Sequence, residues 1–550
     1  MTMEPESLAF PTLSDEQMTC LSEYGRELTV AEGDALFRQG DARSDFYIIL
    51  DGEIDIVDEA STPEMHLATH GRGRFTGELN MLTGQAALAT ARVRTDGRVL
   101  AIEATCLRVI MATHVELGDM VLAAFVERRA MLMKEGLADL RIFGSRYSPA
   151  THQLREFAER SRLPHKWIDL DSDPEADAML AQFGLNASDT PVVICHGRQV
   201  LKNPTVETLA QCLGLHARSV APGQRVDLIV IGAGPAGLAA AVYAASEGLS
   251  TLTLDVGGVG GQAGSSSKIE NYLGFPTGIS GADLAERAMV QAMKFGARIA
   301  LSSEVIALRP DGHGYLVDLV GGTTAEARSV IIATGARYRK LPLSRLGQFE
   351  CNGIYYTAGE MEARLCGPEE VVIIGSGNSA GQAAVFLSAR ARHVYLVVRG
   401  DDLAHSMSRY LIDRIREADT IDVLVRTQAR ELLGDAHLEG VVLDTDGEAS
   451  RTIHTKFVFS FIGAEACTRW LDGTVALDRS GFIMTGAAAE QAAPASFARR
   501  NSRPTGLLET SLPGVFAVGD VRSGSVKRVA SAVGEGSMAV KFVHEFLAVS

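Results

Sequence analysis

The sequence VDLIVIGAGPAGLAAAVYAASEGLSTLTLD, at residues 226–255, decides the fold of the long C-terminal part of this chain. It predicts a buried strand over residues 228–231, a glycine-rich turn, and an Ala-rich helix that leads to a second strand. Gly232, Gly234 and Gly237 stand where missing side chains allow a tight turn, close approach to a pyrophosphate, and close packing of helix on strand. The free N–H groups at the start of the helix are expected to face the phosphates.

An acidic residue closes the second strand of this unit. Asp255 follows Gly237 by eighteen positions, where a carboxylate would accept hydrogen bonds from a ribose hydroxyl. A glycine-rich turn without a ligand is the alternative, which the flanking strand, helix and acid disfavour. We therefore expect a dinucleotide site formed by Gly232, Ala233, Gly234, Pro235, Ala236, Gly237 and Asp255.

A second unit of the same kind occupies residues 371–400, VVIIGSGNSAGQAAVFLSARARHVYLVVRG. Arg399 follows its second strand in place of an acid, which suits the extra phosphate of NADPH better than the free hydroxyl of NADH, although NADH stays possible. A solvated surface arginine is the alternative interpretation. Two dinucleotide sites in one chain imply electron transfer between their ligands. The expected contacts of the second site are Gly375, Gly377, Asn378, Ser379, Ala380 and Arg399.

The length and net charge of the chain indicate a multidomain protein and argue against some kinds of partner. A chain of 550 residues that is 46% hydrophobic is expected to form several domains with sizeable cores. Its net charge of −16 argues against nucleic acid or an anionic membrane as a partner. The N-terminus resembles no signal peptide and no run of 18 apolar residues follows, so we expect a cytoplasmic protein without a membrane span.

The seven cysteines are scattered, and no two of them have Cys-x-x-Cys spacing. These spacings predict neither a disulfide framework nor a metal site, so most of the cysteines are expected to be small buried side chains.

Residues 18–104 read as short alternating strands separated by Gly and Asp turns, which predicts an antiparallel β-roll, and residues 112–134 read as one or two helices. The run LFRQGDARSDFYIILDGEIDIV, followed by FTGELNMLTG, resembles cyclic-nucleotide-binding domains. The resemblance implies that Gly77, Glu78 and Leu79 open the phosphate-binding cassette, with Glu78 facing the ribose.

The same resemblance breaks down at the cyclic phosphate. Where the family has an arginine, this chain has Ala87 and Leu88. Arg92 or Arg94, further along the strand, could reach back to the site. We expect a weak or altered nucleotide ligand, because a buried anion without a cation is costly.

Residues 140–215 alternate strands and helices in a pattern that resembles the thioredoxin fold, with Thr190 and Pro191 where that family has its cis-proline. The active-site dithiol of that family would follow the first strand. Here Ser148 and Thr151 stand in place of the two cysteines, and a hydroxyl cannot exchange with a disulfide. We therefore interpret this domain as a docking or spacing module.

The segments GGVGGQAGSSSKIENYLGFP, ATGARYRKLP and GVFAVGDVRSGSVKRVASAVGEGS, in this order around the second glycine motif, resemble the low-molecular-weight thioredoxin reductases across residues 225–550. The resemblance implies FAD and a homodimer. It places Gly261, Gln262 and Asn271 on the flavin side and Thr334 and Gly335 where the chain crosses between domains. It also places Gly519 and Asp520 at the ribityl phosphate, and Arg528, Val529 and Ala530 near the ring.

This chain departs from those reductases at their dithiol. The segment GIYYTAGE has Thr357 and Glu360 at the two cysteine positions. The cluster that binds the 2′-phosphate is reduced to Arg399, with Gly400 and Ala404 where further arginines are expected.

The sequence thus predicts a multidomain α/β and β protein: a β-roll with helices (1–138), a thioredoxin-like domain (139–217), an FAD domain (225–340 and 465–550), and an inserted NAD(P)H domain (341–464). The leading hypothesis is an NADPH oxidoreductase with FAD that reduces a quinone, a ferredoxin or flavodoxin, or a small acceptor without a protein dithiol. No catalytic acid or base stands out. The alternatives are a regulatory sensor that binds nucleotides and flavin, and a conventional thioredoxin reductase that uses Cys351 or Cys366.

Overall fold

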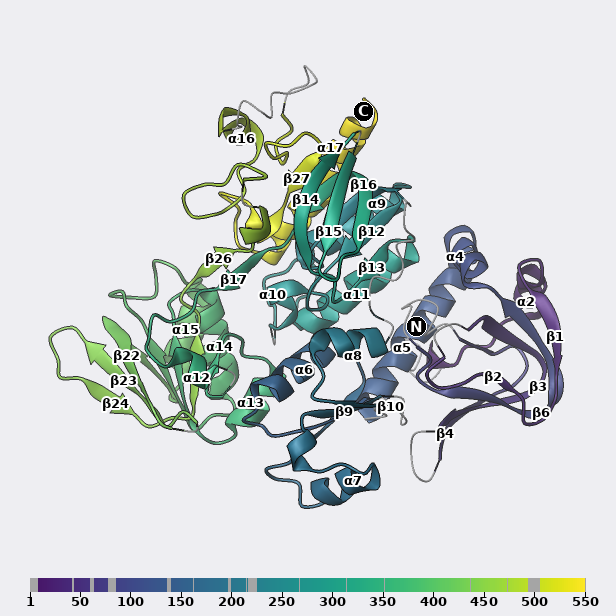
Figure 1. Cartoon of the computed structure of the whole chain (residues 1–550), viewed down its shortest axis with the longest axis horizontal. Coiled ribbons are helices and arrows are strands. Elements are labelled where there is room, and N and C mark those ends of the chain that lie inside the picture. Colours follow the sequence, from purple (N-terminus) through teal and green to yellow (C-terminus); the bar gives the residue numbers. More distant parts are fainter. Residues whose placement is uncertain are drawn as a thin grey trace.

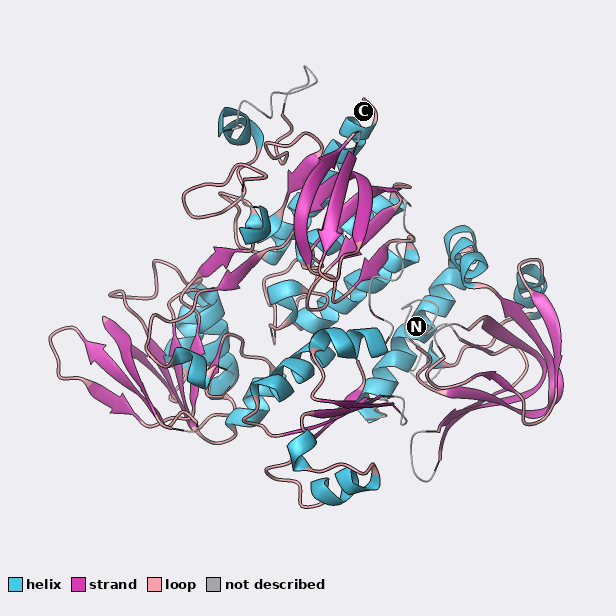
Figure 2. Cartoon of the chain, in the orientation of Figure 1, coloured by secondary structure: helices cyan, strands magenta, loops and turns pink. Residues whose placement is uncertain are grey.

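The structure is a computed structural model, shown in Figures 1 and 2. It describes residues 8–41, 44–59, 64–77, 86–135, 140–161, 163–195, 199–213, 215, 225–266, 268–312, 314–350, 352–435, 437–471, 473–492 and 505–549.

The N-terminal part is an antiparallel β-roll followed by two helices, as its alternating apolar pattern predicts. Its sheet has the strand order β1-β6-β3-β4, with β2 paired to β6 and β5 to β3. The chain breaks its helical run at His114. The elements are α2 (Asp15–Ser22), β1 (Arg26–Val30), β2 (Ala35–Phe37), β3 (Phe46–Asp58), β4 (Met65–His70), β5 (Phe75–Thr76), β6 (Thr90–Ile102), α4 (Ala104–Thr113) and α5 (Val115–Glu135).

A small domain, here called the middle domain (residues 140–215), follows the long helix α5. Its four-stranded sheet has the order β10-β9-β7-β8, and only β7 and β8 are parallel. The Thr190–Pro191 peptide bond is cis. The elements are β7 (Leu140–Gly144), α6 (Pro149–Arg160), β8 (His165–Asp169), α7 (Ala176–Gln182), η1 (Ala187–Asp189), β9 (Val192–Cys195), β10 (Gln199–Lys202) and α8 (Val206–Cys212).

The first βαβ domain contains the glycine motif at residues 232–237. Its sheet has the order β13-β12-β11-β16-β15-β14, and β27 near the C-terminus adds to β16 in parallel. The β strands 11, 12, 13 and 16 are parallel and buried, as expected where helices cover the sheet. The elements are β11 (Arg225–Ile231), α9 (Pro235–Ser246), β12 (Thr251–Leu254), α10 (Gly261–Gly264), α11 (Gly281–Lys294), β13 (Arg298–Ala300), β14 (Val305–Asp311), β15 (Gly314–Leu319), β16 (Thr324–Ile332), η2 (Arg469–Leu471), α16 (Gly486–Ala492), β27 (Val515–Ala517), η4 (Gly519–Val521) and α17 (Val529–Leu547).

In the sequence, the second βαβ domain is inserted between two segments that together form the first. The chain enters and leaves it through an antiparallel pair, β17 (Ala336–Tyr338) and β26 (Ala464–Ala466), which Figure 1 shows between the two domains. Its parallel sheet has the order β18-β25-β19-β20-β21, beside an antiparallel sheet of β22, β23 and β24. The remaining elements are α12 (Leu346–Phe349), β18 (Ile354–Tyr355), α13 (Glu360–Cys366), β19 (Glu370–Ile374), α14 (Asn378–Ser388), β20 (His393–Val397), α15 (Arg409–Glu417), β21 (Ile421–Leu424), β22 (Thr427–Leu433), β23 (Gly440–Thr445), β24 (Arg451–Ile453) and β25 (Phe457–Ser460).

One hydrophobic core joins the β-roll, the middle domain and the first βαβ domain. Phe125 of α5, Phe157 of α6 and Met289 of α11 are buried in the same cluster. Beside it, Arg129 donates from Nε to Glu286 at 3.0 Å, and the Arg129 side chain is only 2% exposed. A buried ion pair is costly to separate, so the N-terminal part is fixed against the first βαβ domain.

Among the described residues, no single helix is long and apolar enough to cross a membrane. Two consecutive segments, Ala104–Met111 and Val115–Arg129, reach the required length and hydropathy only when they are joined across a bend of 117°.

Candidate functional site

The turn between β11 and α9 leaves no room for side chains at two of its glycines. A Cβ atom on Gly237 would lie 1.8 Å from the carbonyl oxygen of Gly232. A Cβ atom on Gly232 would lie 2.3 Å from the carbonyl oxygen of Ala333, and the φ angle of Gly232 is +110°. Glycine adopts this conformation without a steric penalty, so the strand and helix can approach each other closely here.

The N-terminus of α9 is open. Gly234 is its N-cap and provides no side-chain hydrogen bond, and Pro235 occupies the first turn. The amides of the first turn of a helix have no partner within it, so they are available to a ligand. The nearest atom to a Cβ on Gly234 would be the Cα of Gly261, at 3.8 Å. With Ala233 and Ala236 buried beneath, these two facing glycines form a cradle that fits a pyrophosphate.

The Asp255 carboxylate organises this cradle. Its Oδ2 accepts a hydrogen bond from the N–H of Ala233 at 2.7 Å, and its Oδ1 accepts from Gly257 at 2.8 Å and Gly258 at 3.0 Å. A carboxylate offers about four acceptor positions. One position, on Oδ2, is therefore left for the ribose hydroxyl that the sequence predicts here.

Gln262, predicted on the flavin side, meets Thr334 and Gly335, predicted at the crossing between domains, where the chain passes between the βαβ domains. Gln262 donates from Nε2 to the carbonyl oxygen of Ala336. Thr334 donates from Oγ1 to the carbonyl oxygen of Cys467 at 3.0 Å, and the carbonyl of Gly335 accepts from the Cys467 N–H at 3.1 Å. These bonds hold β17 and β26 beside the glycine cradle.

Of the other two predicted flavin-side residues, Gly261 faces Gly234 in the cradle, and Asn271 lies apart from this group. Its side chain is exposed, and the structure gives it no hydrogen bond within the described residues. The adjacent Glu270 instead bridges the two βαβ domains, because its carboxylate pairs with Lys268 at 3.0 Å and with Arg414 of α15 at 2.6 Å.

The C-terminal helix α17 packs over the same cradle. A Cβ on Gly519 would lie 2.9 Å from the Cβ of Ala236, and a Cβ on Gly536 would lie 2.1 Å from the carbonyl oxygen of Ala236. Glu535 accepts from the N–H of Gly519 at 2.7 Å and pairs with Arg522. Sequence reasoning missed Gly536 and Glu535, although the Gly-x-Gly spacing in the final helix was a signal for close packing.

The remaining predicted residues of this site lie at the start of α17. Burial raises the pKa of the Asp520 carboxyl, while the Lys527 ammonium lowers it. Arg528 is the N-cap of α17, Val529 is its first residue, and the side chains of Arg528 and Ala530 are exposed. The start of α17 is linked to Asp520 of η4, because Lys527, two residues before the helix, donates to the Asp520 carbonyl oxygen at 2.8 Å.

The second glycine motif repeats the geometry of the first. Gly375 has a φ angle of +150°, and a Cβ there would lie 2.6 Å from the carbonyl oxygen of Phe461. Gly377 is the N-cap of α14, which again has no side-chain cap, and Ala380 is fully buried. The Asn378 side chain accepts a hydrogen bond from the N–H of Ser408 at 2.7 Å, so it fixes the neighbouring loop.

Arg399 lies in the loop after β20 with its side chain exposed. Asp401 and Asp402 follow it and are exposed as well. The local charge at this edge is therefore not strongly positive, which weakens the attraction for a 2′-phosphate.

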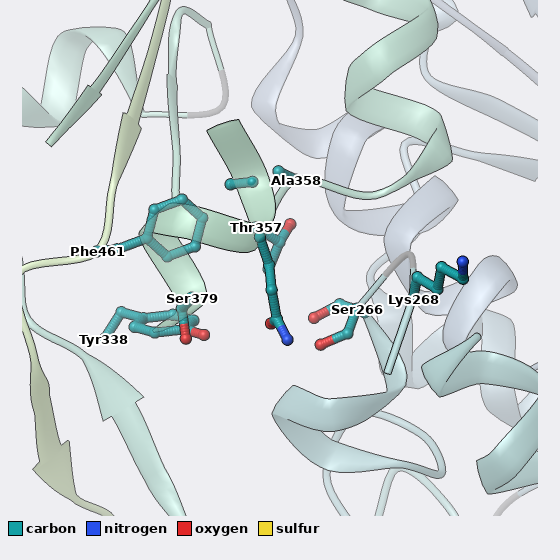
Figure 3. A pocket seen from close by; sticks show the side chains of 10 residues that line it. Ser266, Lys268, Tyr338, Thr357, Ala358, Ser379 and Phe461 are labelled. Carbon is teal, nitrogen blue, oxygen red and sulfur yellow. The ribbon is translucent and has the colours of Figure 1, made fainter. Parts of the chain in front are cut away.

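A cavity of about 40 Å³ lies where the two βαβ domains face each other (Figure 3). Thr357 and Ser266 come from opposite domains, and Tyr338 hydrogen-bonds to Ser379 at one side. None of the lining residues is a cysteine. They are Ser265, Ser266, Lys268, Tyr338, Thr357, Ala358, Ser379, Gln382, Ala383 and Phe461.

In the β-roll, the structure shows why Gly77 must be glycine. Its φ angle is +98°, and a Cβ would lie 2.4 Å from the carbonyl oxygen of Asp45. The other two predicted cassette residues, Glu78 and Leu79, lie outside the described residues.

Arg92 is the arginine that could replace the missing cation of the cyclic-nucleotide pocket, but two carboxylates already pair with it. Arg92 pairs with Glu59 at 2.8 Å and with Glu64 at 2.9 Å, and these hydrogen bonds raise its pKa. Ala87 is buried nearby and supplies no charge. Arg94 lies 3.6 Å from Glu53.

Comparisons with known proteins place this geometry in a family. A model of the pyridine nucleotide-disulphide oxidoreductases matches residues 226–536, more than half of the chain. The chain is 34% identical to the thioredoxin reductase of Bacillus subtilis (strain 168) over 327 residues, which cover 58% of this chain and 94% of that protein. This chain belongs to the thioredoxin reductase family.

Further matches agree with this assignment. The chain is 30% identical to a 34.2 kDa protein in the rubredoxin operon of Clostridium pasteurianum, over 59% of this chain and 98% of that protein. The crystal structure of Lactococcus lactis thioredoxin reductase matches with a TM-score of 0.53 at 26% identity, covering 59% of this chain and 99% of that one.

The N-terminal part matches a different family: a cyclic nucleotide-binding domain model covers residues 27–114.

The thioredoxin reductase family uses FAD and NAD(P)H, and the residues present fit both. The open α9 N-terminus, held close to the strand by Gly232 and Gly237, where a Cβ would collide, fits the pyrophosphate of FAD. The open α14 N-terminus does the same for the nicotinamide dinucleotide. The protein is therefore an FAD- and NAD(P)H-dependent oxidoreductase of this family.

Cys366 and Cys467 are poorly suited to redox chemistry. Burial raises the pKa of the Cys366 thiol, and it also raises the pKa of Cys467, so neither forms a thiolate readily. Cys351 lies outside the described residues. Within the described part of the chain, no group of three His, Cys, Asp or Glu side chains could hold a metal ion.

We predict that Gly237→Ala weakens FAD binding at least about five-fold, because the new methyl group would push α9 off the strand and displace the phosphate cradle. Overpacking of this kind costs about 1 to 3 kcal/mol, and each 1.4 kcal/mol is ten-fold in affinity. Absorbance after reconstitution with FAD measures the effect. Gly534→Ala in α17 is the matched control, since a Cβ there meets nothing within 4 Å. Equal FAD affinity in both variants would contradict the assignment of this turn.

Proposed function

We propose that this protein transfers hydride from NADPH to FAD and passes the electrons to an acceptor without using a protein dithiol. The observation that carries the proposal is the cavity between the βαβ domains, where Thr357 stands at a cysteine position of the family and no lining residue is a thiol. Bound FAD supplies the ability to accept two electrons as hydride and to release them singly or in pairs. The acceptors that fit are a quinone, a ferredoxin or flavodoxin, or a small molecule.

The residues around the cavity would position the reactants. Burial raises the pKa of the Tyr338 hydroxyl, which stays protonated and bonded to Ser379 at the open end of α14. Phe461 packs edge-on against Tyr338, with ring centroids 5.6 Å apart. This aromatic pair forms one wall of the cavity, beside the open N-terminus of α14.

We also propose that the middle domain is thioredoxin-like and serves for docking. Its support is the order of strands and helices, with α6 following β7 as in that fold. Ser148 is used as the N-cap of α6, and Thr151 is 1% exposed. His152 of the same helix lies against Tyr355 of the second βαβ domain, with ring centroids 5.8 Å apart. This helix end is therefore occupied by an internal contact and carries no thiol.

We predict that NADPH bleaches the flavin while turnover with thioredoxin or an aromatic disulfide stays at background, because Thr357 and Glu360 cannot form a thiolate pair. Substituting all seven cysteines by serine should leave flavin reduction intact. Anaerobic stopped-flow absorbance measures both steps, with B. subtilis thioredoxin reductase as the positive control for disulfide turnover. Disulfide turnover that the wild type shows and the folded cysteine-free variant lacks would reveal a hidden dithiol and overturn the proposal.

For the nicotinamide, we propose NADPH with Arg399 as its phosphate contact. We predict that Arg399→Ala raises the KM for NADPH at least ten-fold more than the KM for NADH, since a hydrogen bond to a charged group contributes about 1.5 to 3 kcal/mol. Arg392→Ala is the control, because that exposed side chain pairs with Glu370 at 3.2 Å, before β20. Equal changes for the two nucleotides would show that Arg399 is only a surface charge.

In the β-roll, we propose that cyclic nucleotides are not tight ligands. The buried cyclic phosphate would need a cation, and Arg92 is already held by Glu59 and Glu64. We predict that calorimetry on the full chain finds no submicromolar binding of cyclic AMP or cyclic GMP, and that neither changes the rate of flavin reduction at micromolar concentration. Submicromolar binding that Arg92→Ala abolished would show that Arg92 leaves its carboxylates for the phosphate.

A further inference from the structure

The end of helix α6, in the middle domain, lies against the loop that follows β12 in the first βαβ domain. A Cβ on Gly258 would lie 3.1 Å from the backbone carbon of Arg160 and 3.2 Å from the Oγ of Ser161. A Cβ on Gly257 would lie 3.3 Å from Nη1 of Arg160. Figure 1 shows α6 directly beneath α10 and α11. The two glycines of this loop therefore let a helix from another domain approach the end of β12.

The polar groups that α6 brings to this loop lack partners. The Nε of Arg160 and the Oγ of Ser161 are both buried, and neither has a hydrogen-bond partner among the residues that the structure describes. In the described part of the chain, the ion pair of Arg160 is with Glu156 of the same helix, at 3.6 Å. That separation is too long for a hydrogen bond. An unsatisfied buried polar group is unfavourable. The Arg160 side chain as a whole is 29% exposed, so another part of its guanidinium is open to a ligand.

The position of this loop identifies the ligand. The amides of Gly257 and Gly258 bind Asp255 Oδ1, and Asp255 Oδ2 binds the N–H of Ala233 in the phosphate turn. The adenosine half of a dinucleotide lies at the carboxyl ends of the first two strands of such a unit, next to the acid that ends the second. The loop after β12 offers no cationic side chain to the anionic AMP half, because Asp255 is followed by Val, Gly and Gly at residues 256–258.

We propose that Arg160 of the middle domain forms part of the FAD site and binds the AMP half of the cofactor. Its guanidinium supplies donors and a positive charge to the phosphate and ribose oxygens. The proposal rests on FAD binding by this family and does not depend on the identity of the electron acceptor. It makes the middle domain a component of the cofactor site as well as a spacer.

The test is to measure the binding of FAD to the full-length apoprotein by flavin fluorescence. Arg160→Ala should raise the Kd for FAD about ten- to a hundred-fold, as expected for the loss of charge-assisted hydrogen bonds. Arg160→Lys should recover part of the affinity, because it keeps the charge. Glu156→Ala is the matched control, since it removes the ion-pair partner of Arg160 and should leave the Kd unchanged. At saturating FAD, Arg160→Ala should still be reduced by NADPH, which separates this proposal from the proposed function.

A second measurement addresses the part of FAD that is recognised. ADP, which carries the AMP half, should compete with FAD for the wild-type apoprotein and lose this ability in Arg160→Ala. A Kd for FAD within two-fold of wild type in Arg160→Ala would overturn the proposal. So would a Glu156→Ala variant with the same loss, because the effect would then come from the stability of α6, and so would unchanged competition by ADP.

Discussion

The close contact between Gly237 and Gly232 is the constraint on which the site depends. It brings α9 onto β11 at a distance that no side chain permits, and it directs the free amides of the helix at the edge of the sheet. Helix α17 also approaches α9 closely at this place, because Gly536 packs against the backbone of Ala236. The cradle is thus held from two sides by backbone contacts, and its shape does not rely on flexible side chains.

The chemistry of the protein depends on the residues and domains around the glycine cradle. The family match covers residues 226–536, and that region supplies two dinucleotide sites connected by β17 and β26. At the place where the two domains face each other, hydroxyl, amide, ammonium and aromatic side chains line the cavity. Such a lining can hold and orient ligands, but it cannot exchange with a disulfide. The N-terminal domains add a long helix, α5, and a bridging helix, α6, that contact the reductase-like part through a shared core.

Much of the fold follows from local sequence patterns. The glycine motifs, the alternating strands of the β-roll and the inserted position of the second βαβ domain all depend on residues close together in the chain, so they could be predicted. The contacts between domains could not. Arg129 and Glu286 are 157 positions apart, and their pairing depends on how four domains pack. The double role of Asp255, the exposure of Asn271 and the approach of Arg160 to Gly257 also depend on geometry that no local pattern encodes.

The central claim is that electrons pass through the flavin without a protein dithiol. An anaerobic titration of the FAD-loaded protein with dithionite tests it most directly, because a redox-active disulfide would take up two electrons in addition to the two that FAD accepts. We expect complete reduction after about two electrons per FAD. A requirement for about four electrons per FAD would show that a pair of cysteines takes part, and would contradict this account.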